Sequence, residues 1–174
     1  MGAAPPAYRY QLDSARSAIG ARVTVMGFAH KSAQFPKMSG GIVLSPGQIG
    51  VVDLDVAVDE RALSTVDKTV ESQLKGPGFL DVKHHPVVRF SGQRMTMTGP
   101  ATALVSGQLT ARGTTRQAVL QVSFAAPPTQ ATGRDPVQIS ARTTIDRRAF
   151  GMNGYSMVVG SNVTITINAR MVPG

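Results

Sequence analysis

An alternation of apolar and polar residues, with a period of two, runs through most of this chain and limits the folds open to it. It is clearest in 117–124, where Ala118, Leu120, Val122 and Phe124 fall on one side of an extended chain. The same alternation recurs at 19–25, 52–58, 88–90, 95–97, 101–109, 137–145 and 163–171. Together with 38–44, these segments predict about eight or nine half-buried strands, a number and spacing typical of an antiparallel barrel or sandwich.

One segment departs from this period. In 64–75, Val66, Val70 and Leu74 lie four residues apart, as on one face of a helix. Ser64, followed three residues later by Asp67, resembles a capping box, and the Gly-Pro-Gly at 76–78 would end the helix. We therefore expect an all-β chain with one short helix near 64–75.

The length of 174 residues suits a single domain. We predict a disordered segment at 1–7 and one β-barrel domain at 8–174. No apolar stretch approaches the ~20 residues of a membrane-spanning helix, and no apolar core of a signal peptide is present. The start "AAPPA" is typical of a mature end left after a signal peptide has been removed. We therefore expect a periplasmic or secreted protein.

Closing an antiparallel sheet into a barrel removes its exposed edges. The interior of an eight-stranded barrel is either filled by side chains or holds one small ligand. Here aromatic residues make up only 5% of the chain, Trp is absent, and many inward candidates are Ala, Val or Gly, which leave space. Eight Met residues add adaptable apolar surface that suits flexible ligands. A filled barrel that acts through protein–protein interaction, as an exported stress-related protein would, stays open as an alternative.

Candidates for catalysis are few. His84 and His85 precede Pro86, which favours an extended chain whose neighbouring side chains point apart, so the pair is poorly placed to share one metal ion. Asp81 lies three residues before His84 and could orient its ring. A His-assisted hydrolase at these residues is the weakest hypothesis, since no nucleophile motif accompanies them. We expect no catalytic residue, no metal site and no enzyme activity.

The net charge of +8 favours anionic partners such as acidic lipid surfaces. Binding of nucleic acid would need aromatic side chains inside a basic groove, and the six Phe residues are not interleaved with basic clusters, so we expect none. Asp146 and Arg147 are adjacent on a predicted strand and therefore face apart. We expect each to find its own partner on a charged rim at the barrel mouth.

Five motifs, in order, carry a resemblance to a known family. They are "YQLDSARSAI" (10–19), "FLDVKHHPVVRF" (79–90), "GQLTARGTTRQAVLQVSF" (107–124), "IDRRAFGM" (145–152) and "VTITINARMV" (163–172). Together they resemble the conserved motifs of YceI-like proteins over nearly the whole chain. The resemblance implies an extended, lipocalin-like antiparallel β-barrel with a short helix. It also implies a periplasmic carrier of a long-chain isoprenoid lipid or isoprenoid quinone, without a cofactor, in a family with several dimers.

The chain departs from the family's motifs at three positions. Arg16 stands where the family usually has His, His85 where it has Tyr, and Leu80 where it has Phe. A guanidinium at position 16 would favour an anionic head group such as phosphate.

Three partners are expected from the resemblance and the net charge. They are an amphiphilic isoprenoid ligand, a second copy of the chain in a homodimer, and a membrane surface in transient contact.

Strand parity predicts which side chains would bind the ligand. The candidates for the barrel lumen are Val23, Val25, Phe79, Phe90, Met95, Met97, Leu109, Leu120, Val122, Phe124, Phe150, Met152 and Ile165. The candidates for the mouth, where a polar head group would lie, are Arg16, His85, Arg147 and Tyr155.

Overall fold

The computed structural model describes residues 6–174, which form strands, one α-helix and five 3-10 turns. The strands are β1 (Tyr8–Leu12), β2 (Ala18–Val25), β3 (Ala29–Gln34), β4 (Met38–Leu44), β5 (Val51–Asp59), β6 (Val87–Met97), β7 (Thr102–Ala111), β8 (Thr114–Phe124), β9 (Val137–Asp146) and β10 (Val159–Pro173). The helix is α1 (Lys68–Lys75), and the turns are η1 (Ser14–Arg16), η2 (Pro46–Gln48), η3 (Glu60–Ala62), η4 (Pro128–Gln130) and η5 (Arg147–Phe150). The predicted disorder of 1–7 falls mainly on residues outside this range, and the first strand begins at Tyr8.

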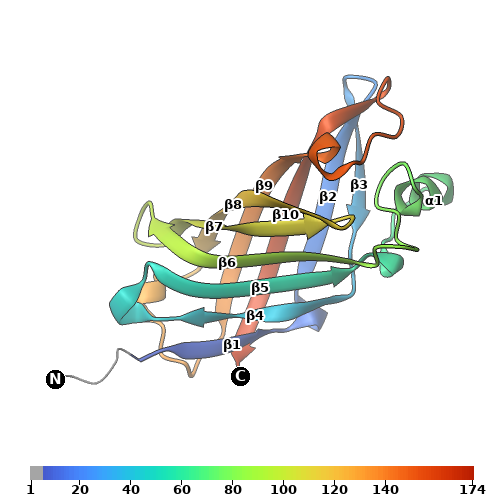
Figure 1. Ribbon diagram of the computed structural model, residues 1–174. Coiled ribbons are helices and arrows are strands. Elements are labelled where there is room, and N and C mark those ends of the chain that lie inside the picture. Colours follow the sequence, from blue (N-terminus) through green and yellow to red (C-terminus); the bar gives the residue numbers. More distant parts are fainter. Residues whose placement is uncertain (1–5) are drawn as a thin grey trace.

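The strands form one antiparallel sheet that closes into a barrel, as the alternation and the resemblance predicted (Figure 1). Eight strands make the ring, in the order β1, β4, β5, β6, β7, β8, β9 and β10, with β1 returning to β10. One edge of β10 pairs with β9 along most of its length. The other edge is shared, since 159–168 pair with β2 and 171–173 pair with β1.

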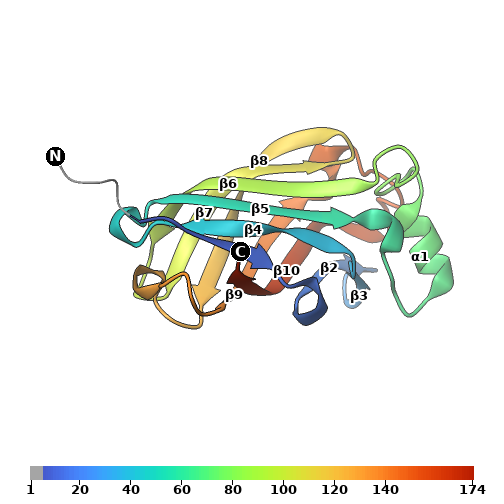
Figure 2. The same ribbon diagram turned by 90° about the horizontal axis from the view of Figure 1, so that it is seen from below.

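The hairpin of β2 and β3 is not part of this ring of eight strands. The mouth of the barrel lies beside the hairpin. β3 ends the strand order, and its outer edge meets one isolated partner, where Gln34 and Ser64 exchange two backbone hydrogen bonds of 2.8 and 2.9 Å. Both views place α1 and its flanking loops at this end of the barrel (Figures 1 and 2). The chain between β5 and β6 therefore covers an opening that no strand closes.

The end of the barrel away from α1 is filled by its own side chains. The most deeply buried side chains of this region, each at most 2% exposed, are Tyr10, Ile42, Leu44, Val105 and Met171. The Tyr10 hydroxyl accepts a hydrogen bond from the Gly133 backbone at 2.9 Å, which satisfies the one polar group among them. A hollow that runs through the whole barrel, as expected from the small residues, is therefore wrong for this half.

Strand β6 is continuous where the sequence indicated two short alternating segments. Its pairing with β7 shifts register between Gly92 and Arg94, so Phe90 and Met95 are both buried although their positions differ in parity. The Phe90 ring lies across the strands, against the backbone of Gly107. A Cβ atom on Gly107 would collide with the Ser91 carbonyl oxygen, so only glycine permits this approach.

The helix begins later than the sequence predicted. Asp67, not Ser64, is the N-cap, and its carboxylate accepts hydrogen bonds from the backbone of Thr69 and Val70 at 2.9 and 3.3 Å. Val66 lies before the helix and is fully exposed. Strand β3 was missed because most of its side chains are exposed, so it carries little apolar alternation.

Candidate ligand-binding site

An apolar cavity of about 140 Å³ occupies the half of the barrel next to α1. Its wall comes from β2, β3, β5, β6, β7, β9 and β10, together with η3, α1 and the loops after α1 and η5. The residues on this wall are Ile19, Ala21, Val23, Lys31, Ala33, Phe35, Val56, Val58, Glu60, Leu63, Leu74, Phe79, Leu80, Val88, Phe90, Leu109, Ala111, Ile145, Arg147, Met152, Val163, Ile165 and Ile167. Within the described chain, the wall has three polar side chains, on Lys31, Glu60 and Arg147.

The cavity lies where three inward positions carry small side chains. Ala21, Ala33 and Ala111 line it from β2, β3 and β7, whereas the filled half holds the large side chains of Tyr10, Ile42, Leu44 and Met171. An apolar cavity of ~150 Å³ in a protein core stays free of water and accepts a benzene ring. The space available here is therefore that of one ring or a short piece of hydrocarbon chain.

The predicted lumen residues divide between the cavity wall and the filled core. Those on the wall are Val23, Phe79, Phe90, Leu109, Met152 and Ile165. Those buried in the hydrophobic core and away from the cavity are Met95, Leu120, Val122, Phe124 and Phe150. Met97 is partly buried against that core, and Val25 is half-buried beside the β2–β3 turn. Strand parity separates inside from outside, but it carries no information on which inward positions leave space.

Three of the four predicted mouth residues lie at the α1 end. Arg147 is on the cavity wall, Tyr155 is on the loop after η5, and His85 packs against the β7–β8 turn at Gly113. Arg16 lies elsewhere, because it ends the exposed turn η1 and is absent from the cavity wall. Arg16 is therefore not placed to bind an anionic head group at this cavity.

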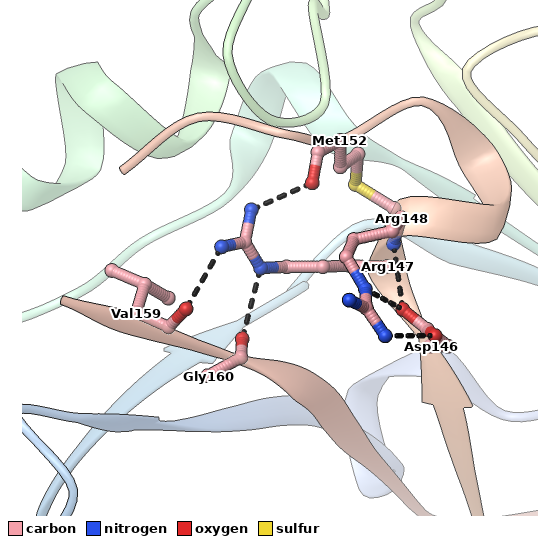
Figure 3. Close-up of polar contacts among 6 residues, drawn as sticks. All are labelled: Asp146, Arg147, Arg148, Met152, Val159 and Gly160. Carbon is pink, nitrogen blue, oxygen red and sulfur yellow. Dashed lines mark hydrogen bonds and ion pairs between the residues drawn. The ribbon is translucent and has the colours of Figure 1, made fainter. Parts of the chain in front are cut away.

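Arg147 is buried, with 1% of its surface exposed, instead of forming part of a charged rim as expected. Its guanidinium donates to three backbone carbonyls, those of Gly160, Met152 and Val159, at 2.9, 2.6 and 3.0 Å (Figure 3). Burial lowers the pKa of Arg147 from its usual value. The side chain thus ties the loop after η5 to the start of β10.

Asp146 and Arg147 do not form an ion pair with each other, as predicted. Asp146 instead accepts two hydrogen bonds from the Arg148 guanidinium, at 3.1 and 3.0 Å (Figure 3). The Arg147 guanidinium lies 5.0 Å from the centre of the Phe79 ring, which in turn stacks on Tyr155 at 5.8 Å. This stack joins the loop before β6 to the loop after η5.

These two loops, 76–86 and 151–158, together form a lid over the cavity. Gly154 donates a backbone hydrogen bond to the Gly78 carbonyl at 2.8 Å, and Arg112 donates to the carbonyls of Phe79 and Gly151. The lid is also held by the Phe79–Tyr155 stack, by the hydrogen bond from Arg147 to the Met152 carbonyl, and by the burial of the Phe79 and Met152 side chains.

Glu60 is a buried polar residue of the wall that is absent from the predicted lumen and mouth residues. It follows Val52, Leu54, Val56 and Val58 in the inward phase of β5, so an acidic residue in an apolar series was the signal available. The side chain is 0% exposed, and neither carboxyl oxygen has a hydrogen-bond partner within residues 6–174. Burial, and to a lesser degree the charge of Asp59, raises the pKa of the Glu60 carboxyl to about 8. Glu60 is therefore a neutral carboxylic acid at pH 7.

The histidines lie outside the cavity. Residues 82–84 form a turn and not the extended chain expected, because the backbone N–H groups of His84 and His85 both donate to the Asp81 carbonyl, at 3.1 and 2.9 Å. Asp81 does orient His84, with 3.0 Å between its carboxylate and Nδ1, and this hydrogen bond lowers the pKa of Asp81. In the described residues, no group of three His, Cys, Asp or Glu side chains is placed to hold a metal ion.

The fold and the cavity together define a β-barrel with an apolar cavity under two loops, and comparison with known proteins identifies its family. The sequence profile of the YceI-like domain matches residues 10–171, so the chain belongs to the YceI-like family. A UPF0312 protein of Vibrio cholerae is 22% identical over 145 residues, which are 82% of this chain and 77% of that protein.

Solved structures share the fold over nearly the whole chain. BcnA of Burkholderia cenocepacia superposes with a TM-score of 0.80 at 21% identity, covering 91% of this chain and 98% of that one. A polyisoprenoid-binding domain of Saccharophagus degradans, implicated in plant cell wall breakdown, has a TM-score of 0.71 at 11% identity, covering 95% and 98%. None of the helices in the described residues is long and apolar enough to cross a membrane.

The buried Glu60 carboxyl predicts an unusual dependence of stability on pH. In the unfolded chain it ionises near its ordinary pKa of 4.5, whereas in the folded barrel it stays protonated up to about 8. The unfolded state then binds fewer protons between these values, so the free energy of unfolding falls as pH rises, by up to about 1.4 kcal/mol per pH unit. Urea denaturation of the wild type and of Glu60→Gln, which cannot ionise, measures the difference. Parallel pH profiles for the two proteins would contradict the assignment.

The crossing of the two lid loops can be tested at Gly154. A Cβ atom there would lie 2.7 Å from the Gly78 carbonyl oxygen and 2.9 Å from its Cα atom, so Gly154→Ala must push the loops apart. We expect a loss of about 1–3 kcal/mol in the free energy of unfolding, from the added crowding. We also expect faster entry of an environment-sensitive apolar dye, measured by stopped-flow fluorescence. Ser156→Ala, an exposed position on the same loop, is the control and should leave both quantities unchanged.

Proposed function

We propose that this protein binds and carries a long-chain isoprenoid lipid or isoprenoid quinone in the periplasm or outside the cell, without catalysing a reaction. The observation that supports this most directly is the apolar cavity, which is closed by a lid and lies inside a barrel of the YceI-like family. A structural relative described as a polyisoprenoid-binding domain supports the ligand class. Apart from Lys31, Glu60 and Arg147, the described wall offers hydrocarbon contacts, which suit an apolar ligand and no particular chemistry.

Burial of hydrocarbon supplies the affinity in this proposal. Each CH₂ group moved out of water contributes roughly 0.8 kcal/mol, so a few isoprene units are sufficient for tight binding, even after the entropy cost of ordering the chain. The cavity of about 140 Å³ holds only a part of such a ligand. The remainder would pass the lid at Phe79, Leu80 and Met152, whose movement would lengthen the site.

An exposed apolar tip beside the lid supports a transient contact with a membrane surface. It consists of Met26, Phe28, Met157 and Val158 from the β2–β3 turn and the loop after η5, which are 61%, 80%, 95% and 39% exposed. The Met26 backbone donates to the Val158 carbonyl at 2.7 Å and so joins the two segments. Apolar side chains on a protein with a net charge of +8 suit an anionic bilayer. Formation of a homodimer stays a prediction from the family resemblance.

The carrier function predicts that lipid accompanies the purified protein. Organic extracts of protein isolated from its native compartment should contain an isoprenoid lipid or quinone, identified by mass spectrometry. Delipidated protein should then take up an isoprenoid quinone from detergent in a ratio of about one per chain. Absence of lipid from the extract, together with no uptake, would refute carriage and favour the filled-barrel alternative.

The membrane contact is tested by altering the apolar tip. The double variant Phe28→Ser, Met157→Ser should transfer quinone from vesicles of phosphatidylglycerol at least about tenfold more slowly than the wild type, since it loses roughly 1.5–3 kcal/mol of apolar contact per side chain at the bilayer. Its affinity for quinone in detergent should be unchanged. Val51→Ser, an exposed apolar position at the opposite end of the barrel, is the control. Equal transfer rates for all three proteins would refute the proposed contact.

A further inference from the structure

Glu60 is a polar group that a pure hydrocarbon carrier has no use for. A buried carboxyl without a hydrogen-bond partner costs folding free energy, and the cost is greater in apolar surroundings. Here the carboxyl lies on the wall of the apolar cavity at the α1 end of the barrel, with both oxygens unpaired within the described residues. The backbone N–H of Glu60 is already bound to the Pro86 carbonyl at 2.8 Å, so the turn that carries the side chain is fixed.

The other polar side chains of the wall are poorly suited to bind a ligand inside the cavity. Arg147 uses three of its five N–H groups on backbone carbonyls and lies against the Phe79 ring, so its guanidinium is held in place by the protein itself. Lys31 belongs to the exposed residues of β3, where water competes for its ammonium group. Glu60 is therefore the solvent-shielded wall residue whose side chain makes no hydrogen bond within the described residues.

The protonation state of Glu60 decides which chemical group it can bind. A neutral carboxyl group can donate one hydrogen bond to a carbonyl oxygen. A phosphate would place negative charge beside a group that burial already keeps from ionising. A cationic amine would share the cavity with the positive charge of Arg147. The site thus suits a neutral acceptor.

The size of the cavity restricts the acceptor further. A volume of about 140 Å³ matches a single six-membered ring and is far smaller than a long isoprenoid tail. Taking the isoprenoid carrier function as its basis, we propose that the cavity receives the ring of a benzoquinone-type head group and that the Glu60 carboxyl donates a hydrogen bond to one ring carbonyl. The tail then leaves through the lid, toward the apolar tip formed by Met26, Phe28, Met157 and Val158.

The test compares two ligands that differ only in the ring oxygens, 2-geranyl-1,4-benzoquinone and geranylbenzene. The chain has no cysteine, so the quinone meets no thiol with which to react. Dissociation constants are measured by isothermal titration calorimetry for the wild type, Glu60→Leu and Glu60→Gln, after thermal melting has shown that each is folded. Glu60→Gln keeps an N–H donor of similar size and is the matched control.

The hydrogen bond predicts opposite effects on the two ligands. Glu60→Leu should weaken binding of the quinone by about tenfold, as the loss of one hydrogen bond of typical strength does, and should strengthen binding of geranylbenzene. Glu60→Gln should bind the quinone within about threefold of the wild type, since its amide can still donate. An equal change for both ligands in Glu60→Leu would overturn the role of Glu60 and leave the carrier function standing. Binding of neither ligand to the wild type would overturn both.

Discussion

The division of one edge of β10 between two partners is the constraint on which the rest of the structure depends. Where 171–173 pair with β1, the ring of eight strands is complete and its interior is filled. Where 159–168 pair with β2, the β2–β3 hairpin takes the place of β1 beside β10. Within the described residues, β3 pairs with no further strand. The barrel is therefore closed at one end and open at the other, and the cavity lies at the open end.

The buried Arg147 gives this open end a defined shape. Three backbone carbonyls surround its guanidinium, and Phe79 covers one face of it, so the loop after η5 is tied to the start of β10. Desolvation of a guanidinium is costly, and the three hydrogen bonds offset that cost locally. The arrangement allows the wall of the cavity to include a charged residue whose guanidinium is held by backbone carbonyls.

Much of the fold follows from the sequence, whereas the site follows only in part. Alternation identified the long strands because one face of each is buried, and the family resemblance supplied the closed ring. Strand β3 escaped because an exposed edge strand needs no apolar face, and the change of parity at Gly92 escaped because a bulge depends on the partner strand. Glu60 could have been found, since it continues the inward series of β5. The space around Ala21 could not have been found from the sequence, because the empty volume beside a side chain depends on residues that are distant in sequence.

Phe79 connects the cavity with the exposed loop after η5. Phe79 lines the cavity, and its ring also stacks on Tyr155, two residues before the exposed Met157. In a carrier of the proposed kind, a ligand that displaces Phe79 would also shift the segment that meets the bilayer. Thermodynamic linkage then requires reciprocity: if occupancy changes the affinity for a membrane, the membrane changes the affinity for the ligand by the same factor. If the ligand-free form binds a membrane more strongly than the ligand-bound form does, such a protein would release its ligand at the membrane surface.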